Sequence, residues 1–359
     1  MQIIYNGIES LSTALKGSCK VLLVCDSSFQ YLSIKQNIEE MGVPFVKFDQ
    51  FTPNPLYEDV CKGVELFNDT KCDTILAVGG GSSLDVAKCI KLYCKMSKNQ
   101  LYLEQEYVDT GVKLVAIPTT AGTGSESTRY AVIYYDGKKQ SVTHDSIVPN
   151  IAILEPTVLK TLPLYQKKCT MLDAYCQGIE SWWSVNATDE SKKLSKIAVE
   201  TITKWWHEYI FDNTDAAAKA IMQAANIAGQ AICITQTTAP HAFSYKITSL
   251  YRLPHGHAVA VCLPEIWDYM LTQPISPELR NTFEEIANAM GVSSNPIDAV
   301  SKFRSMLGDM EIANPSSENR ASDINILTKS VNPIRLRNSP VVFDENTIRR
   351  LYEKIVKSM

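Results

Sequence analysis

The 359-residue sequence contains no apolar run long enough to cross a membrane, and its opening, MQIIYNGIES, lacks the basic and apolar regions of a signal peptide. Positive charge is not in excess: the formal net charge of −4 gives no electrostatic reason to bind nucleic acid or an anionic membrane. The ten cysteines include no CxxC pair, which argues against a disulfide framework and favours reduced, buried thiols. These absences predict a cytoplasmic globular protein with no nucleic-acid or membrane partner.

Repeats and low-complexity segments are also absent, and a chain of this length favours two domains. Short apolar runs alternate with helical patterns in the first half, which is typical of parallel βαβ units. We expect strands at 20–25, 44–48, 74–78 and 114–118, helices at 57–68 and 82–94, and a hairpin of 130–135 and 141–143 around Asp136-Gly137. Later patterns are helical, at 189–211, 214–233, 278–290, 296–307 and 345–357. The sequence therefore predicts an α/β domain over residues 1–156 and an all-helical domain over residues 157–359.

Histidine is scarce and unevenly distributed. Three of the five histidines, His241, His255 and His257, lie within residues 237–261. His255 and His257 flank Gly256, where the backbone can turn tightly and bring a ligand close. Because imidazole is the commonest transition-metal ligand, the cluster indicates either a metal site or a histidine-rich surface loop.

A carboxylate upstream favours the metal site. The segment TMLDAYCQGIES predicts a helix with Leu172, Cys176 and Ile179 on its apolar side, and Asp173 and Gln177 project together from another face. An aspartate with two downstream histidines would give three N/O ligands and leave coordination positions open, as in a catalytic divalent-metal site. The alternative is an exposed polar pair on an ordinary amphipathic helix.

Two polar glycine loops suit a dinucleotide. VGGGSSLDVAK, at 78–88, follows a predicted strand and opens a helix, so its backbone N–H groups could bind a pyrophosphate; the alternative is a tight turn capped by Ser82 or Ser83. It is neither a GxGxxG fingerprint nor a Walker A motif. Asp26 either caps a helix or accepts ribose hydroxyls, and in the latter role it would favour NAD over NADP. The hydroxyl-rich loop at 118–126 could hold the nicotinamide end and the other phosphate.

Several ordered motifs, VGGGSSLDVAK, IPTTAGTGSEST, the LDA segment with Asp173, and PHGHAVA, resemble the iron-containing (group III) alcohol dehydrogenase family. VNP at 331–333 and NSPV at 338–341 resemble the closing segment of that family, so the resemblance covers essentially the whole chain. It implies a dehydroquinate synthase-like architecture: a Rossmann-like dinucleotide-binding α/β domain and an all-helical metal-binding domain. It also implies a cleft between them for NAD(P) and one divalent metal, Fe²⁺ or Zn²⁺.

The resemblance also implies roles for individual residues. Asp173, His241 and His255 match family metal ligands, and Gln177 stands where the family usually has a fourth ligand, a histidine. His257 and Tyr245 are the candidates for a catalytic proton relay. The implied cofactor-binding residues are Asp26, Asn54, Gly79, Gly80, Gly81, Ser82, Asp85, Thr119, Thr120, Thr123 and Ser125.

The departures from the family pattern point to one branch. DAYCQGIESWWSVNATDESKK and TTAPHAFSYKITSLYRLPHGHAVAVCLP resemble the branch that includes phosphonoacetaldehyde reductases, which implies NAD(P)H-dependent reduction of phosphonoacetaldehyde to 2-hydroxyethylphosphonate. Arg129, Lys246 and Arg252 would bind the phosphonate, or else are solvated surface charges.

Three other functions stay open: a general alcohol or glycerol-type dehydrogenase, a dehydroquinate synthase-like cyclase or lyase that regenerates its NAD, and a non-enzymatic binding module. The expected small-molecule partner is an aldehyde or its alcohol. A homodimer would form if the strand at residues 2–5 pairs across an interface.

Overall fold

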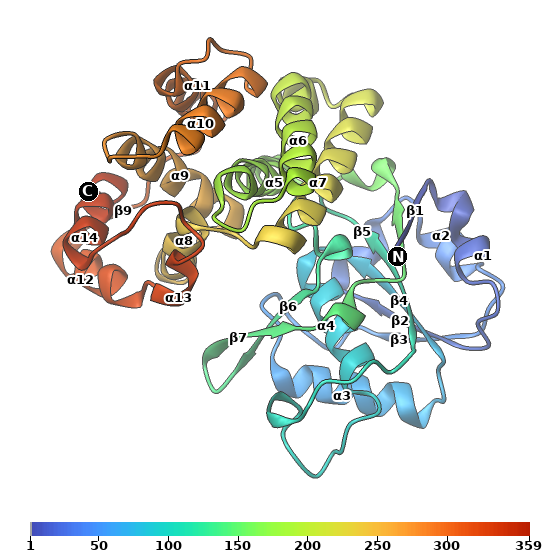
Figure 1. Cartoon of the computed structure of the whole chain (residues 1–359). Coiled ribbons are helices and arrows are strands. Elements are labelled where there is room, and N and C mark those ends of the chain that lie inside the picture. Colours follow the sequence, from blue (N-terminus) through green and yellow to red (C-terminus); the bar gives the residue numbers. More distant parts are fainter. Residues whose placement is uncertain (1) are drawn as a thin grey trace. The chain divides into compact units, whose positions relative to one another are not determined.

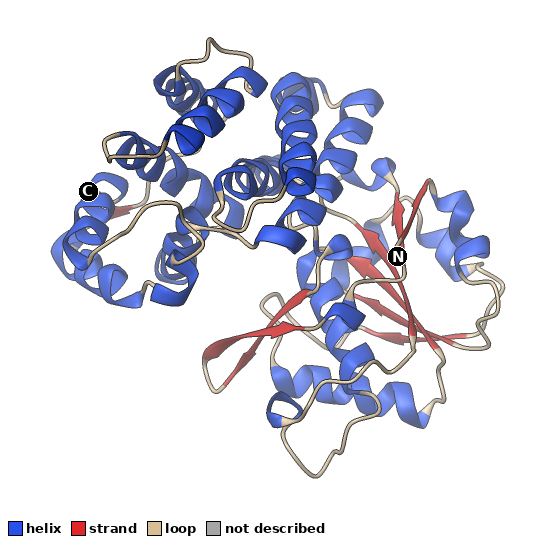
Figure 2. Cartoon of the chain, in the orientation of Figure 1, coloured by secondary structure: helices blue, strands red, loops and turns tan. Residues whose placement is uncertain are grey.

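The computed structural model describes residues 2–359, which form two compact units that divide after Leu162. Strands are concentrated in the first unit and the second is almost entirely helical (Figure 2), so the predicted fold class is confirmed. The observed division comes later in the chain than the predicted boundary after residue 156. The reason is that the short 3-10 helix η6 (Pro156–Leu159) still belongs to the first unit. None of the helices within residues 2–359 is long and apolar enough to cross a bilayer.

The first unit is built on a parallel sheet of six strands, ordered β1-β8-β5-β4-β2-β3 (Figure 1). A separate antiparallel hairpin, β6 and β7, turns at Asp136 and Gly137, which have φ angles of 50° and 68°. Two successive positive φ angles are what a two-residue Asp-Gly hairpin requires, so the predicted hairpin is confirmed. The strands and helices of this unit are β1 (Ile3–Asn6), α1 (Leu11–Ala14), β2 (Val21–Cys25), α2 (Lys35–Glu39), β3 (Phe45–Phe48), α3 (Tyr57–Asp69), β4 (Thr74–Gly79), α4 (Gly81–Tyr93), β5 (Lys113–Pro118), β6 (Tyr130–Tyr135), β7 (Lys138–Thr143) and β8 (Ile151–Leu154).

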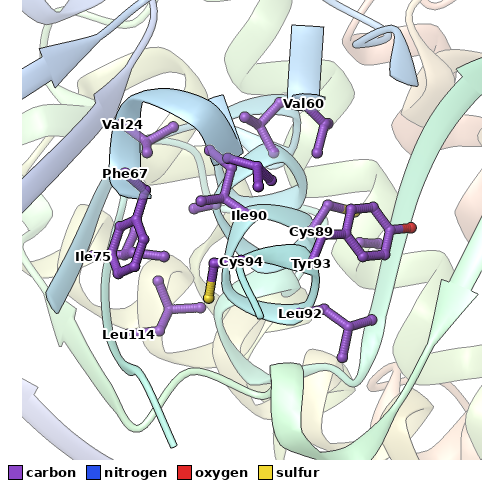
Figure 3. Close-up of a cluster of buried hydrophobic side chains, with 14 of the residues drawn as sticks. Val24, Val60, Phe67, Ile75, Cys89, Ile90, Leu92, Tyr93, Cys94 and Leu114 are labelled. Carbon is purple, nitrogen blue, oxygen red and sulfur yellow. The ribbon is translucent and has the colours of Figure 1, made fainter. Parts of the chain in front are cut away.

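The centre of this sheet is buried on both faces. Every residue of β2 and β4 is buried, which is why their sequences are continuous apolar runs and not alternating ones. On one face, Val24, Ile75 and Leu114 pack with Phe67 of α3 and Ile90 of α4 (Figure 3). The core thus fixes α4, and with it the loop that precedes α4, against the middle of the sheet.

The order of the strands reverses between β2 and β4. From β2 the chain adds β3 on one side, and then returns to add β4 and β5 on the other. Ligands of open α/β sheets bind outside the carboxyl ends of the strands at such a switch point. In this chain Asp26 follows β2, Gly80 follows β4 and Thr119 follows β5, so three of the predicted cofactor residues meet at that edge.

β1 lies at an edge of the sheet and pairs with β8 of the same chain, from Ile3 with Ile151 to Asn6 with Leu154. β8 was not predicted from the sequence, and the homodimer predicted from residues 2–5 stays a prediction.

The second unit is a helical assembly in which α5 packs against α6, α7 and α9. A two-stranded ladder, β9 with β10, ties the end of the chain to the segment before α12. Its elements are α5 (Leu164–Trp183), α6 (Asp189–His207), α7 (Asp215–Thr235), α8 (Ala239–Tyr251), α9 (His255–Leu271), α10 (Pro277–Ala289), α11 (Pro296–Asp309), β9 (Ser316–Ser317), α12 (Arg320–Ser330), α13 (Pro333–Leu336), α14 (Glu345–Ile355) and β10 (Lys357–Ser358).

Candidate metal centre and nucleotide-binding edge

Three helices of the second unit bring Asp173, His241 and His255 together. One ligand atom from each residue lies within 4.8 Å of the other two, with Asp173 on α5, His241 on α8 and His255 at the start of α9. The Oδ1 atom of Asp173 is 3.3 Å from Nε2 of His241, and the two imidazole centroids are 5.3 Å apart. Asp173 is 3% exposed, so the alternative of a solvated pair on the surface of α5 is wrong.

Glu180 orients His241, a role that was not predicted from the sequence. Its Oε1 atom lies 2.5 Å from His241 Nδ1, while its Oε2 atom accepts hydrogen bonds from the backbone N–H and the hydroxyl of Thr238, both at 2.8 Å. A carboxylate that accepts on Oε1 keeps the imidazole proton on Nδ1 and turns the Nε2 lone pair towards Asp173. The spacing could have identified this residue, because positions 173, 177 and 180 (i, i+4, i+7) share one face of a helix.

The electrostatics of this cluster fit a cation. Burial alone would raise the pKa of Asp173, but its contact with His241 and the charge of His255 hold that pKa below the ordinary value. Burial alone would lower the pKa of His241, but the charges of Glu180 and Asp173 raise it to about 9. Two buried carboxylates around one imidazole therefore demand positive charge, and Asp173 Oδ1 and His241 Nε2 have no well-aligned hydrogen-bond partner among residues 2–359. A divalent metal satisfies both atoms.

Gln177 lies one helical turn after Asp173 and is equally buried, at 3% exposure. Its side chain forms a hydrogen bond with the Asp173 carboxyl group that helps to lower the pKa of Asp173. The amide is therefore beside the ligand cluster, and its coordination of the metal stays a prediction.

Gly256 has a different role from the predicted one. It does not form a turn: it lies in the first turn of α9, and a Cβ atom there would be 1.9 Å from the carbonyl oxygen of Cys169 and 2.9 Å from Cβ of Asp173. The missing side chain lets α9 touch the backbone of α5, which is what brings His255 beside Asp173. The predicted tight turn is wrong because a glycine in sequence does not distinguish a turn from a close helix contact.

His257 and Tyr245, the two relay candidates, differ in their surroundings. His257 is buried, with Nε2 donating to the carbonyl oxygen of Ala313 and Nδ1 accepting from the hydroxyl of Tyr165, both at 2.7 Å. Burial lowers the pKa of His257, so this doubly bonded ring stays neutral. A relay through His257 would have to break one of these bonds. The ring of Tyr245, in contrast, stacks on the imidazole of His255 at a centroid distance of 5.8 Å.

The carboxyl edge of the sheet in the first unit carries the predicted cofactor residues. Asp26 accepts a hydrogen bond from the backbone N–H of Ser28 at 2.8 Å, so it caps the short 3-10 helix after β2, as one of the two interpretations predicted. It also accepts a hydrogen bond from the hydroxyl of Ser83 at 3.0 Å. The second bond ties the end of β2 to the first turn of α4. Its contact with a ribose stays a prediction, but the position at the switch point is the one that this contact requires.

Gly79 closes β4 with a φ of 156°, and a Cβ atom there would be 2.3 Å from the hydroxyl oxygen of Ser83. Its carbonyl accepts from the backbone N–H of Thr119 at 3.0 Å, which joins the first loop to the second. Asn54, at a φ of 59°, donates its N–H to the hydroxyl of Ser82 at 3.4 Å. The glycine turn is therefore bordered by two other loops, those that contain Asn54 and Thr119.

The threonines of the second loop lie against the glycines of the first. A Cβ atom on Gly80 would be 3.5 Å from the Thr120 side chain, and one on Gly81 would be 3.0 Å from that of Thr123. The two predicted cofactor loops are thus in contact with each other at the start of α4. Their contacts with a dinucleotide stay predictions.

Asp85 and Lys88, on α4, hold the second loop (residues 118–126) in place through hydrogen bonds to Ser125. Asp85 accepts from the hydroxyl of Ser125 at 2.8 Å and from the backbone N–H of Val132 at 3.0 Å. Lys88, 0% exposed, donates to Ser125 Oγ at 3.0 Å and to the carbonyl oxygen of Tyr130 at 2.8 Å. Burial raises the pKa of Asp85, and the positive charge of Lys88 opposes this shift. Asp85 and Ser125 therefore position the loop, whether or not they also touch the cofactor.

The three predicted phosphonate-binding cations are in different settings. Arg129, in the first unit, forms an ion pair at 3.1 Å with Asp145. Lys246, on α8, is half-buried, and Arg252 is exposed at the end of α8 with a φ of 54°. Their role in substrate binding stays a prediction.

We expect Glu180→Gln to weaken metal binding by about 10- to 100-fold, the usual effect of losing a partner that orients a histidine ligand. A glutamine oxygen facing Thr238 turns the amide N–H₂ group towards His241, which moves the imidazole proton to Nε2, where it blocks the metal. Metal affinity would be measured by competition with a chelating dye. Glu190→Gln, at an exposed position on α6, is the matched control; equal affinities for the two variants would contradict the orienting role.

Comparisons with known proteins bear on both units. The profile "Iron-containing alcohol dehydrogenase" matches residues 3–156, and the profile of the C-terminal region of the Fe-containing alcohol dehydrogenase family matches residues 168–356. The probable alcohol dehydrogenase EutG of Escherichia coli is 31% identical over 264 residues, which cover 72% of this chain and 66% of that protein.

Two further relatives are of interest for the substrate. The phosphonoacetaldehyde reductase of Streptomyces viridochromogenes is 34% identical over 211 residues, which cover 55% of this chain and 53% of that enzyme. The structure of sulfoacetaldehyde reductase from Bifidobacterium kashiwanohense in complex with NAD⁺ has the same fold, with a TM-score of 0.88 at 21% identity over 99% of this chain and 96% of the other. The aligned part of this chain thus spans about half to two thirds of the length of these curated relatives.

Proposed function

Because this chain belongs to the iron-containing alcohol dehydrogenase family, we propose that it interconverts a small aldehyde and a primary alcohol with NAD(H) and a divalent metal, Fe²⁺ or Zn²⁺. The observation that carries this proposal is the buried cluster of Asp173, His241 and His255, with Glu180 fixing the proton of His241. The preferred substrate that we propose is phosphonoacetaldehyde, reduced to 2-hydroxyethylphosphonate.

The residues of the second unit prepare the reacting carbonyl. Asp173, His241 and His255 would hold the metal, and the buried side chain of Gln177 would provide a fourth, neutral ligand. When bound, the metal supplies Lewis-acid polarisation of a carbonyl oxygen and NADH supplies the hydride. We favour the Tyr245 hydroxyl as the proton donor, because its ring stacks on His255, whereas both ring nitrogens of His257 are already hydrogen-bonded.

The first unit supports cofactor binding. The turn at Gly79, Gly80 and Gly81 exposes backbone N–H groups at the start of α4, where the positive end of the helix dipole favours a pyrophosphate. The carboxylate of Asp26 at the switch point would accept ribose hydroxyls and repel a 2′-phosphate, so NAD(H) is favoured over NADP(H).

A substrate comparison tests the proposal. Metal-loaded protein is expected to oxidise NADH with phosphonoacetaldehyde, acetaldehyde and propionaldehyde, with the largest kcat/KM for phosphonoacetaldehyde. Equal kcat/KM values would reduce the proposal to a general aldehyde reductase of this family. If no aldehyde supports NADH oxidation while the metal remains bound, the dehydrogenase function itself is contradicted.

A further inference from the structure

The first turn of α9 carries two histidines with different surroundings. His255 belongs to the cluster of metal ligands, while His257 is 5% exposed and, because residues two apart on a helix do not share a face, is directed elsewhere. Its Nε2 atom is 2.7 Å from the carbonyl oxygen of Ala313, and its Nδ1 atom is 2.7 Å from the hydroxyl of Tyr165. Three parts of the second unit therefore meet at this imidazole: the first turn of α5, the first turn of α9 and the segment between α11 and β9.

These two hydrogen bonds have only one possible direction. A carbonyl oxygen can only accept, so Nε2 of His257 carries the ring proton and donates it to Ala313. Nδ1 is then unprotonated, and it accepts from the hydroxyl of Tyr165. The one donor and the one acceptor of a neutral imidazole are thus both in use, and the ring connects its two partners as a bridge.

The segment that contains Ala313 is itself held on both sides. Before it, the backbone N–H of Ile312 donates to the carbonyl oxygen of Leu307, near the end of α11, at 2.9 Å. After it, Nδ2 of Asn314 donates to the carbonyl oxygen of Ile355 at 2.7 Å, and the ladder of β9 with β10 continues the attachment. The carbonyl group of Ala313 is therefore a fixed point to which His257 ties the start of α9.

The start of α9 depends on such outside contacts. Its N-cap residue is Pro254, which forms no side-chain capping bond, and uncapped helix ends fray. His255 is the first residue of this helix, so its position is only as fixed as that turn. Gly256 supplies one contact, against the backbone of Cys169 on α5, and the imidazole of His257 supplies a second through its two hydrogen bonds.

We propose that His257 is a positioning residue of the metal centre: by bridging Tyr165 and Ala313 it holds the first turn of α9 so that His255 stays beside Asp173. This inference rests on the metal centre of the proposed function and assigns to His257 a role other than proton transfer. An apolar side chain of similar size would fill the same space, but apolar packing has no preferred direction, whereas a hydrogen bond weakens when its angle changes.

The test uses the full-length, metal-loaded protein and the variants His257→Leu, His257→Gln and Tyr165→Phe. We expect His257→Leu to weaken Zn²⁺ binding by about 10-fold, measured by competition with a chelating dye, which is the lower end of the range for residues that support metal ligands. With Co²⁺ as the probe, the visible absorption bands should shift, because they depend on the ligand geometry. Tyr165→Phe, which removes only a hydroxyl, should cause a smaller change in the same direction. His257→Gln should recover part of the loss, since an amide offers both a donor and an acceptor.

Two further variants are matched controls. Tyr269→Phe removes a hydroxyl from the last turn of the same helix, where it donates to the carbonyl oxygen of Val342 at 3.3 Å, and it should bind both ions as the unmodified protein does. Because Tyr165 acts through His257, the double variant of Tyr165→Phe with His257→Leu should bind Zn²⁺ no more weakly than His257→Leu alone.

Several outcomes would overturn the proposal. If His257→Leu and Tyr165→Phe match Tyr269→Phe in Zn²⁺ affinity and in the Co²⁺ spectrum, His257 does not position His255. A loss of turnover with unchanged metal binding would make His257 a proton relay instead, and a loss of unfolding stability alone would make its role structural. If His257→Leu does not fold, Tyr165→Phe decides the question. If the unmodified protein binds neither ion, the metal centre and with it the proposed function fail first.

Discussion

Asp173→Ala is expected to reduce turnover by on the order of 1000-fold or more while leaving the affinity for NADH unchanged. The variant removes the only carboxylate among the three clustered ligands and leaves two neutral imidazoles, which do not offset the charge of a divalent metal. Lewis-acid polarisation contributes several kcal/mol to such reactions, and about 1.4 kcal/mol corresponds to a factor of ten in rate. The nucleotide-binding edge lies in the other unit and keeps its structure.

Three measurements check this result: metal content by elemental analysis, NADH binding by fluorescence titration, and steady-state turnover. Asp309→Ala, at an exposed position in the last turn of α11, is the control and should match the unmodified protein in all three. Retention of both metal and turnover by Asp173→Ala would rule out the assignment of the metal centre.

Asp85→Ala is expected to lower the free energy of unfolding of the first unit by about 3 kcal/mol, the lower end of the range for removing one partner of a buried charge pair. The charge of Lys88 would remain, 0% exposed, without the nearby carboxylate, and the N–H of Val132 would lose its acceptor. Because Ser125 would lose the same anchor, affinity for NADH should fall as well.

Guanidinium chloride unfolding and NADH titration would measure the two effects. The control is Asp69→Ala, an exposed aspartate in the last turn of α3 of the same unit. Asp85→Asn separates the causes, since it keeps a side-chain oxygen for Val132 but loses the charge. Unfolding midpoints for Asp85→Ala and Asp69→Ala that coincide would contradict a stabilising role for the buried pair.

The elements of the first unit were predictable because local pattern and burial agree there. β2 and β4 are apolar throughout, and the helix after the glycine run begins at Gly81, one residue before the expected start. The strand β8 was not predicted from the sequence, because four consecutive apolar residues show no periodicity that would identify a strand. Its assignment depends on pairing with β1 and β5, which are distant in the sequence.

The candidate site was predictable only in part. Asp173, His241 and His255 are chemically conspicuous, and the structure brings them together. Glu180 resembles an ordinary charged residue of a helix, and its importance comes from its contact with His241, 61 residues away in the sequence. The helical spacing puts Glu180 on the same face as Asp173, but it does not show that His241 packs against that face.

A coordination sphere assembled on packed helices is mechanically stiff. The backbones of α5 and α9 meet at Gly256, where even one added carbon atom would collide with the carbonyl oxygen of Cys169. Because packed helices carry both residues, we expect the distance between Asp173 and His255 to adapt less to the size of a bound ion than ligands on a loop would. First-row divalent ions take nitrogen and oxygen ligands at about 2.0–2.2 Å, whereas Ca²⁺ requires about 2.3–2.6 Å and more oxygens. Gly256, which offers no ligand atom, thus sets the close approach of α9 to α5 on which the distance between the two ligand residues depends.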